Sequence, residues 1–401
     1  MKDTRIKIGI LPHYFLMEDG TFNKDDAIKL SGKIAGVCYD KEGFNHLLNE
    51  DENITMKRVA MTLNNGHHSV YDHTFLNFNI QNIPKILAMV INNEKEYTTS
   101  EKSARYTPII REDYSVITGD EELLYNKWIE IFREQIKDKY GDVYNNSKIK
   151  KLAQENARYL VTVFMPTQMI YTTSLRQINY IASWMAKYMC EVAGHNNTFE
   201  KKLAVAMSEF ISELKKINVL VPELMKNEKH RSLSLFGEKI DNVEEYFGNV
   251  YATTYTASLA ELAQAQRHRT LDYQMEFLTD KEYFVPPIIL DNEELVSEWL
   301  SDINRVKDVY PQGELVKISE MGKYDNFILK CKERLCSSAQ LEIMMQTRET
   351  LFKYKRALEE RNSPLAQDIV KYSHGARCTF PDFECSQDCK FREGKTLTRK
   401  I

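Results

Sequence analysis

The chain has 401 residues, of which 43% are apolar and 28% are charged, proportions that are ordinary for a globular protein with one large or two smaller domains. The formal net charge of −4 argues against a general nucleic-acid-binding protein, which usually carries a basic surface. No apolar run approaches the roughly 20 residues that span a bilayer, and the N-terminus lacks the apolar core of a signal peptide, so we expect no membrane segment and a cytoplasmic location.

Hydrophobic periodicity predicts strands and helices through the first half of the chain. Strands are expected at residues 6–16 and 74–80, the second because apolar and polar side chains alternate there. Helices are expected at residues 27–63, 83–91, 121–140, 147–191 and 199–227. Pro166 falls inside the fourth of these helices and should kink or split it. The polar, Gly-containing segment 228–246 is interpreted as a connection.

The same order of elements recurs in the second half of the chain. A strand is predicted at residues 249–255, and helices are predicted at residues 258–269, 292–308 and 324–361. Such a recurrence indicates an internal duplication. We therefore predict a first repeat at residues 1–227, a second repeat at residues 228–365 and a Cys-containing tail at residues 366–401.

Each repeat carries one half of a charged motif. The second repeat has Gln264-Ala265-Gln266-Arg267-His268-Arg269. The first repeat has Glu101-Lys102-Ser103-Ala104-Arg105-Tyr106, preceded by Asn93-Glu94-Lys95 at the place of the Arg-His-Arg. By itself, Arg-His-Arg is also typical of a solvated helix terminus, where cations suit the helix dipole. Together, the two copies resemble the motif Q-x-x-R-H-R-x-x-S-x-N-E-x-S-x-R-Y of the flavin-dependent thymidylate synthase family.

Further spaced matches extend this resemblance over about residues 60–190 and 250–350. The first repeat has Gly66-His67-His68-Ser69-Val70-Tyr71-Asp72-His73, which is similar to the family's G-H-x-S-P-x-E-H. Downstream matches are Arg158, Thr167, Ser174 and Arg176 in the first repeat, and Arg334 and Ala339-Gln340-Leu341-Glu342-Ile343 in the second. Where one repeat departs from the family motif, the other keeps the family residue. For example, Met185 of the first repeat stands at the position of Arg334 in the second.

The resemblance implies an α+β fold of two related repeats, each a mainly antiparallel sheet flanked by helices. Members of the family are homotetramers whose sites lie between subunits. A fused tandem of the family domain is therefore expected to form a homodimer that mimics the tetramer, with one working site assembled from both half-motifs.

The resemblance also implies roles for the matching side chains. The phosphate and sugar of dUMP would be held by Glu101, Ser103, Arg105 and Arg158. The uracil would be held and activated by Gln264, Arg267 and Arg334. The flavin would be lined by His67, Ser69, Ser174, Arg176, His268 and Arg269. Arginine suits these roles because it binds phosphate bidentately and stabilises an anion that develops on the ring.

The leading prediction is reductive methylation of dUMP to dTMP, with FAD as cofactor, NADPH as reductant and methylenetetrahydrofolate as carbon donor. The redox chemistry would belong to the cofactor, while the protein orients the reactants and excludes water. Two alternatives stay open because Asp272 replaces a family serine and Ser174 replaces a family asparagine. One is a paralogue that modifies another pyrimidine nucleotide, and the other is a nucleotide- or flavin-binding protein without turnover.

The seven cysteines are odd in number and mostly scattered, which argues against a disulfide framework. Cys378, Cys385 and Cys389 cluster in the tail, and Cys336 is a candidate fourth ligand from the helix that carries Arg334. Four thiolates form a usual ligand set of structural zinc, which would staple a short tail. The spacing is not C-x-x-C, so ordinary reduced cysteines are the alternative.

Overall fold

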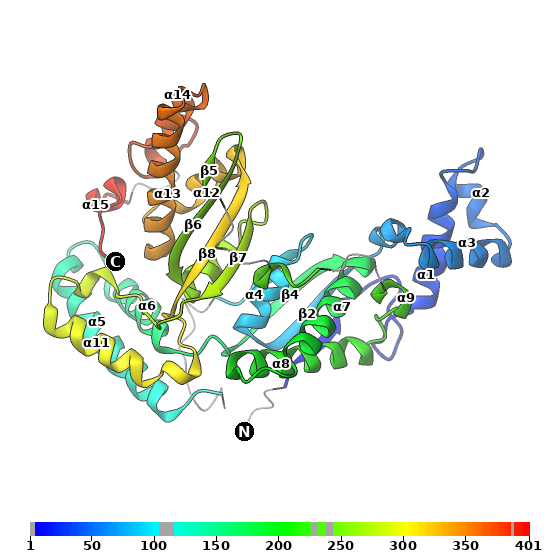
Figure 1. The fold of residues 1–401 in the computed structure, drawn as a ribbon, viewed down its shortest axis with the longest axis horizontal. Coiled ribbons are helices and arrows are strands. Elements are labelled where there is room, and N and C mark those ends of the chain that lie inside the picture. The colour runs from blue at the N-terminus through cyan, green and yellow to red at the C-terminus, as the bar shows by residue number, and fades with distance from the viewer. Residues whose placement is uncertain (1–4, 104–115, 227–230, 238–243, 386–388) are drawn as a thin grey trace. The chain divides into compact units, whose positions relative to one another are not determined.

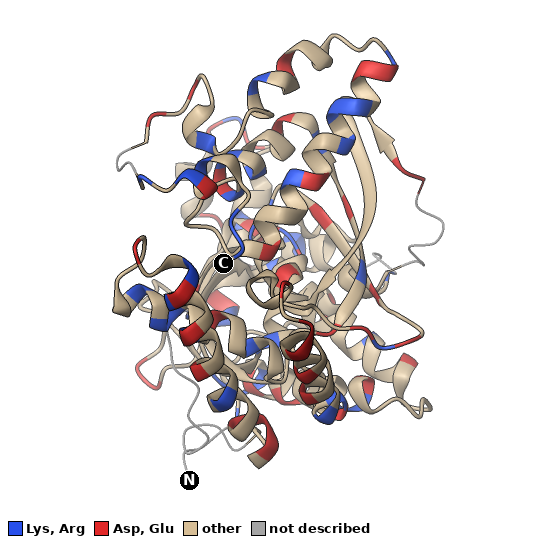
Figure 2. Cartoon of the chain, turned by 90° about the vertical axis from the view of Figure 1, so that its left-hand side faces the viewer, with Lys and Arg blue, Asp and Glu red and all other residues tan. Residues whose placement is uncertain are grey.

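The protein, seen in a computed structural model, is described at residues 5–103, 116–226, 231–237, 244–385 and 389–401. It divides into two compact units (Figure 1): the N-terminal unit contains residues 2–102 and 166–234, and the C-terminal unit contains residues 103–165 and 235–401. Among the described residues, every helix is too short or too polar to cross a membrane. Basic and acidic residues are interspersed along the helices in the view of Figure 2, in keeping with the small net charge.

A four-stranded antiparallel sheet forms the centre of the N-terminal unit. Its strands are β1 (Lys7–Ile10), β2 (Phe75–Pro84), β3 (Thr98–Glu101) and β4 (Pro166–Ser174), in the order β1-β2-β4-β3. On β2, the alternate side chains Leu76, Phe78 and Ile80 are fully buried. The strand predicted at 74–80 from period-two alternation is therefore confirmed.

The helix predicted at residues 147–191 is wrong in its middle. Helix α6 (Asn146–Ala157) and helix α7 (Leu175–Val192) are separated by strand β4, which begins at Pro166. The strand is rich in β-branched and aromatic residues, which suit a pleated surface. Because β4 pairs with both β2 and β3, hydrogen bonds to distant segments outweigh the local helical pattern.

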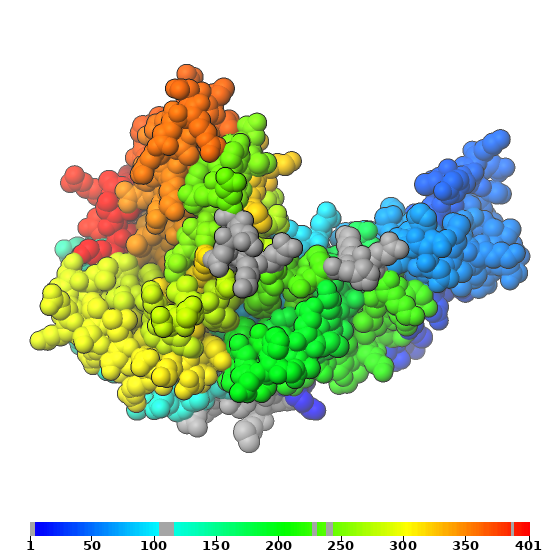
Figure 3. All heavy atoms as spheres, in the orientation of Figure 1, coloured from blue at the N-terminus to red at the C-terminus, as the bar shows by residue number. Residues whose placement is uncertain are grey.

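The helical stretch predicted at residues 27–63 is three helices, α1 (Lys24–Gly36), α2 (Phe44–Leu48) and α3 (Glu52–Asn64). Asp40 ends the run, because its Oδ1 accepts hydrogen bonds from the backbone N–H groups of Glu42 and Gly43, both at 2.8 Å. Gly43 has a φ of +82°, which favours glycine. In the view of Figure 3 these helices form the blue lobe at one end of the N-terminal unit.

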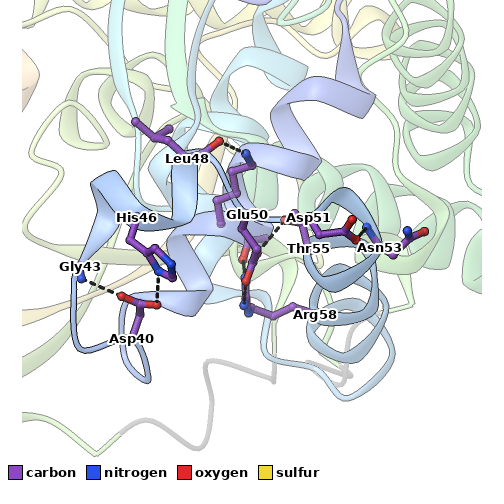
Figure 4. Close-up of polar contacts among 11 residues, drawn as sticks. Asp40, Gly43, His46, Leu48, Glu50, Asp51, Asn53, Thr55 and Arg58 are labelled. Atoms are coloured by element: carbon purple, nitrogen blue, oxygen red, sulfur yellow. Dashed lines mark hydrogen bonds and ion pairs between the residues drawn. The ribbon is translucent and has the colours of Figure 1, made fainter.

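Close packing joins α1 to α3 in this lobe. A Cβ atom on Gly32 would lie only 2.4 Å from Cγ2 of Val59, so the helices approach closely because this position has no side chain. Arg58 of α3 donates to the carbonyl oxygen of Gly32 at 3.0 Å and forms an ion pair with Glu50 at 2.6 Å (Figure 4). The other helices of this unit are α4 (Lys85–Asn93), α7, α8 (Thr198–Lys216) and α9 (Pro222–Met225).

A second four-stranded antiparallel sheet lies in the C-terminal unit. Its strands are β5 (Tyr246–Phe247), β6 (Val250–Ser258), β7 (Asp272–Phe277) and β8 (Leu315–Lys323), in the order β5-β6-β8-β7. The order is equivalent to that of the first sheet. In both sheets the second and fourth strands in chain order run directly into a helix. In the first sheet β2 leads into α4 and β4 into α7, and in the second sheet β6 leads into α10 (Leu259–Ala265) and β8 into α12 (Tyr324–Arg334). The predicted α+β fold with two antiparallel sheets flanked by helices is confirmed.

Helices from distant parts of the sequence share one core in the C-terminal unit. Trp128 of α5 (Gly119–Tyr140) meets Trp299 of α11 (Glu293–Arg305) edge-on, with ring centroids 4.9 Å apart. The indole Nε1 of Trp128 donates to Asp302 at 2.9 Å. Since α5 and α6 pack here, the compact units do not follow the boundaries placed after residues 227 and 365. Those boundaries stay a prediction about the repeats.

The C-terminal segment packs against the same unit. It follows α13 (Leu341–Glu360), and contains α14 (Leu365–Ile369) and α15 (Arg392–Thr396). Phe391 is buried, with its ring centroid 5.6 Å from that of Tyr140. Arg399 donates to the carbonyl oxygen of Ala339 at 2.7 Å. The segment predicted as a tail therefore contributes side chains to the core.

Candidate functional site

In the first repeat, the residues at the place of Arg-His-Arg are Asn93, Glu94 and Lys95, and Glu94 makes its contacts within the N-terminal unit. Glu94 stands where the family histidine would stand, and its side chain is fully buried at the end of α4. It accepts a hydrogen bond from the backbone N–H of Ser234 at 2.7 Å and forms an ion pair with Arg231. The guanidinium of Arg231 lies 3.6 Å from the ring centroid of Trp184. The surroundings of Glu94 are therefore occupied by other side chains of the same unit.

The residues predicted to hold the phosphate and sugar are placed differently from one another. Glu101 ends β3, its side chain is 2% exposed, and it forms an ion pair with Lys85 at 2.6 Å. Ser103 is half-buried. Arg105 lies outside the described residues.

The guanidinium of Arg158 is the unusual feature of this set. The residue is 3% exposed, in a 3-10 turn at Arg158–Leu160 that follows α6. Its Nε and Nη2 atoms are buried without a hydrogen-bond partner. The neighbouring Tyr159 donates to Glu342 at 2.8 Å. Buried polar atoms are almost always paired, so these two nitrogens are an exception.

The predicted flavin residues of the first repeat meet around an aspartate. Ser174 caps α7 by accepting from the backbone N–H of Gln177 at 3.1 Å, and it donates to Asp72 at 2.5 Å. Arg176 donates from Nε to the same carboxylate oxygen at 3.0 Å and pairs with the other oxygen at 2.5 Å. Asp72 was not predicted as a site residue. The signal was its position at the acidic residue of the G-H-x-S-P-x-E-H motif.

Two further predicted flavin residues, His67 and Ser69, are exposed. The histidine between them is structural, because the ring nitrogens of His68 lie 2.9 Å from the hydroxyl of Tyr180 and 2.9 Å from the carbonyl oxygen of Leu63. The structure therefore brings Ser174 and Arg176 together and leaves His67 and Ser69 at the surface.

In the second repeat, Arg334 at the end of α12 meets the segment that follows α10. Its Nε donates to Nε2 of His268 at 2.7 Å, and its Nη2 lies 3.5 Å from the carbonyl oxygen of Gln264. Because Nε2 of His268 accepts this bond, the neutral ring carries its proton on Nδ1. Burial, followed by the charge of Arg334, holds the pKa of His268 well below its usual value. Arg267 and Arg269 are exposed on either side.

Near this cluster lies a buried polar group that the sequence did not indicate. Glu320 of β8 and Lys330 of α12 are both fully buried and pair at 2.5 Å. Glu320 also accepts hydrogen bonds from the hydroxyls of Tyr251 at 2.6 Å and Tyr255 at 3.0 Å. Glu261 of α10 is fully buried as well, and neither of its carboxyl oxygens has a hydrogen-bond partner. The only signal for Glu261 was a Ser-x-x-Glu capping pattern starting at Ser258.

The four cysteines predicted to bind zinc line one pocket of about 290 Å³ in the C-terminal unit, namely Cys336, Cys378, Cys385 and Cys389. Arg377 and Lys395 line the same pocket. Within the described ranges, no set of three or more Cys, His, Asp or Glu side chains is arranged to hold a metal ion. The zinc site stays a prediction.

The family-model match falls within the first predicted repeat. Residues 22–193 match the family model described as thymidylate synthase complementing protein. Relatives include the flavin-dependent thymidylate synthases of Pyrococcus furiosus, 25% identical over 136 residues, and of Thermococcus onnurineus, 25% identical over 163 residues. These alignments cover 32% and 39% of this chain and 53% and 61% of the relatives, so the chain spans little more than half of their length. The predicted resemblance is confirmed.

Proposed function

We propose, from the relationship to flavin-dependent thymidylate synthases, that this protein methylates dUMP to dTMP with FAD, NADPH and methylenetetrahydrofolate. The observation that carries the proposal is Arg158, a 3% exposed guanidinium with two nitrogen atoms that have no hydrogen-bond partner. Burial of such a group costs free energy unless an anion binds it. A nucleotide phosphate is a compact dianion whose oxygens match the guanidinium fork.

Arg334 suits the role of stabilising the uracil as its ring gains electron density. His268 beside it is neutral, so its Nε2 can accept the hydrogen bond at 2.7 Å that orients the guanidinium. Positive charge at a carbonyl oxygen of the ring would stabilise the developing enolate. Gln264 and Arg267, on the same segment, would supply further hydrogen bonds to the ring edge.

Ser174 and Arg176 fit a flavin-binding role because Asp72 holds both in one orientation. The side chain of Arg176 is 26% exposed, so its guanidinium remains accessible from solvent. Bound FAD would supply the hydride that completes the methyl group, with NADPH as the source of electrons. His67, Ser69, His268 and Arg269 are proposed as additional flavin contacts.

We further propose that the chain is a tandem duplication of the family domain and works as a homodimer in the cytoplasm. The equivalent strand orders of the two sheets support the duplication. In such a dimer, Glu101, Ser103 and Arg105 from the first half-motif would complete the nucleotide site.

A structural zinc ion at the tail is part of the proposal. The shared pocket supports it, because Cys336, Cys378, Cys385 and Cys389 come from three separate segments of the chain. A tetrathiolate zinc site carries negative charge, and the cations of Arg377 and Lys395 would offset that charge. Elemental analysis of protein made under reducing, zinc-replete conditions should find about one zinc per chain, and a chelator should lower the Tm. Absence of zinc would refute this part.

Substitution of Arg158 by methionine tests the nucleotide site. Because the arginine is buried with unpaired nitrogens, the variant should fold with unchanged or higher Tm, yet lose dUMP binding by on the order of 2–4 kcal/mol. Arg133→Met is the matched control, since Arg133 is an exposed arginine paired with Glu130. Full dUMP affinity in Arg158→Met would contradict the proposal.

Product identification decides the reaction. The wild-type protein with dUMP, FAD, NADPH and methylenetetrahydrofolate should yield dTMP, detected by chromatography. Tight dUMP binding without dTMP would instead support a binding protein, and a different methylated pyrimidine would support a paralogue with another substrate.

A further inference from the structure

The 3-10 turn that carries Arg158 belongs to the first predicted repeat, but residues of the second predicted repeat hold it. The carbonyl oxygen of Tyr159 accepts a hydrogen bond from the backbone N–H of Gly313 at 2.8 Å. The carbonyl oxygen of Val161 accepts from the backbone N–H of Gln312, also at 2.8 Å. All of these residues lie in the C-terminal unit, so the loop before β8 fixes the backbone directly after Arg158.

The side chain of Tyr159 attaches the turn to the second predicted repeat at another point. The side chain is buried, and its hydroxyl donates to Oε2 of Glu342 at 2.8 Å. Burial raises the pKa of Tyr159 well above its usual value, so the hydroxyl keeps its proton and acts as a donor. The same hydroxyl accepts a hydrogen bond from the side-chain amide of Gln340. Tyr159 therefore connects the turn to the start of α13.

The carboxyl group of Glu342 is itself fixed by the end of β6. Its Oε1 accepts from the backbone N–H of Ser258 at 2.8 Å, and its Oε2 accepts from the hydroxyl of Ser258 at 2.6 Å. Together with the hydroxyl of Tyr159, these contacts engage both carboxyl oxygens. A buried side chain held in one orientation can in turn hold the group that it contacts.

The guanidinium of Arg158 depends on this support for its orientation. Its Nε and Nη2 have no hydrogen-bond partner among the residues that the structure describes, so these two atoms do not anchor it. A guanidinium forms two parallel hydrogen bonds to a phosphate only when its plane faces the phosphate oxygens. The backbone turn and the contacts of Tyr159 therefore decide where the guanidinium points.

We propose that Tyr159 and Glu342 are positioning residues that hold the guanidinium of Arg158 in the orientation that binds a nucleotide phosphate. Tyr159 comes from the first predicted repeat and Glu342 from the second, so the pair joins the two repeats at the nucleotide site. The inference rests on the proposed function, because the phosphate is taken to be that of dUMP.

Tyr159→Phe tests this role, because it removes the hydroxyl and keeps the ring, whose centroid lies 4.8 Å from that of Phe284. Isothermal titration calorimetry of the full-length variant should show dUMP binding about fivefold to tenfold weaker, within the range of a single hydrogen bond. Deoxyuridine has the same base and sugar but no phosphate. Its affinity, measured by competition with dUMP, should stay within about twofold of the wild-type value, because the perturbed group contacts the phosphate.

Tyr251→Phe is the matched control. Tyr251 is also buried in the C-terminal unit, and its hydroxyl donates to a buried glutamate, Glu320 of β8, at 2.6 Å. The control should lower the Tm as Tyr159→Phe does, but it should leave the affinity for dUMP within about twofold of the wild-type value.

Two further variants reach the same pair of residues independently. Glu342→Gln replaces one accepting oxygen with an amide nitrogen, so the same selective loss of dUMP affinity is expected. In an Arg158→Met background, Tyr159→Phe should weaken dUMP binding no further, because the group that it positions is absent.

The outcomes distinguish failure of this inference from failure of the proposed function. Unchanged dUMP affinity in both Tyr159→Phe and Glu342→Gln, with the loss in Arg158→Met retained, would overturn the positioning role and leave the proposed function standing. Equal weakening of dUMP and deoxyuridine by Tyr159→Phe, or an undiminished further loss in the Arg158→Met background, would also overturn the role. Absence of dUMP binding by the wild type would overturn the proposed function and this inference with it.

Discussion

Substitution of Lys330 by methionine should destabilise the C-terminal unit more than most single substitutions. Lys330 and Glu320 are both fully buried and lie 2.5 Å apart. Removing one partner of a buried ion pair leaves the other charge uncompensated, which typically costs about 3–5 kcal/mol. Glu320 would keep two hydrogen bonds from Tyr251 and Tyr255. We therefore expect a loss near the lower limit, about 3 kcal/mol in the free energy of unfolding.

The double substitution Lys330→Met with Glu320→Gln should recover much of this loss. Glutamine is uncharged, so no buried charge remains. Its side-chain oxygen can accept from one of the hydroxyls of Tyr251 and Tyr255, and its amide group can donate to the other. We expect the free energy of unfolding of the double variant to lie within about 1.5 kcal/mol of the wild-type value. The effects of the two substitutions would then not be additive, as expected for residues in direct contact.

Urea denaturation followed by tryptophan fluorescence provides the measurement. Trp128 and Trp299 lie in the core of the C-terminal unit, so their emission reports on its unfolding. A loss below about 1 kcal/mol for Lys330→Met, or a double variant no more stable than the single one, would refute the account of this pair as a coupled buried interaction.

Four further predictions test other parts of the molecule. Gly32→Ala should lower the stability of the N-terminal unit by about 1–3 kcal/mol, measured by thermal denaturation, because its methyl group would lie 2.4 Å from Val59. Arg334→Ala should abolish dTMP formation while sparing much of the dUMP binding, because its charge is needed mainly as the ring becomes an anion; equal losses in kcat and affinity would argue against this role. Lys95→Ala, in the degenerate tripeptide, should leave turnover nearly unchanged. The pKa of His268 is lowered by burial, so the unfolded chain binds this proton first and stability should fall as pH drops below about 6.5; His268→Asn should flatten that part of the Tm profile.

Local pattern determined several features from the sequence alone. Alternation in residues 74–80 predicted β2, and an apolar run predicted α4, whose residues Ile86 to Ile91 are almost fully buried. The spaced residues of the two half-motifs indicated the family and the antiparallel α+β fold. These features are local because each depends on residues that are close in the chain or on a motif with set spacing.

Local pattern failed where pairing with distant segments decides the outcome. Strand β4 was predicted as part of a helix, because the local pattern of apolar residues does not show that this segment pairs with β2 and β3. The helical stretch 27–63 was predicted without its interruptions, although Asp40 and Gly43 mark one of them.

The chemistry of the candidate site was also only partly visible in the sequence. Arg158, Arg334 and His268 were predicted as functional residues from the sequence. Their charge and hydrogen bonding, however, depend on burial and on partners in three dimensions. His268 is neutral because it is buried beside Arg334, which lies 66 residues away in the chain. At the same position of the first repeat stands Glu94, whose ion-pair partner Arg231 lies 137 residues away. The sequence by itself determined which groups are present, and the tertiary structure decided which are charged, paired or left without a partner, because burial and hydrogen bonding arise only when distant segments meet.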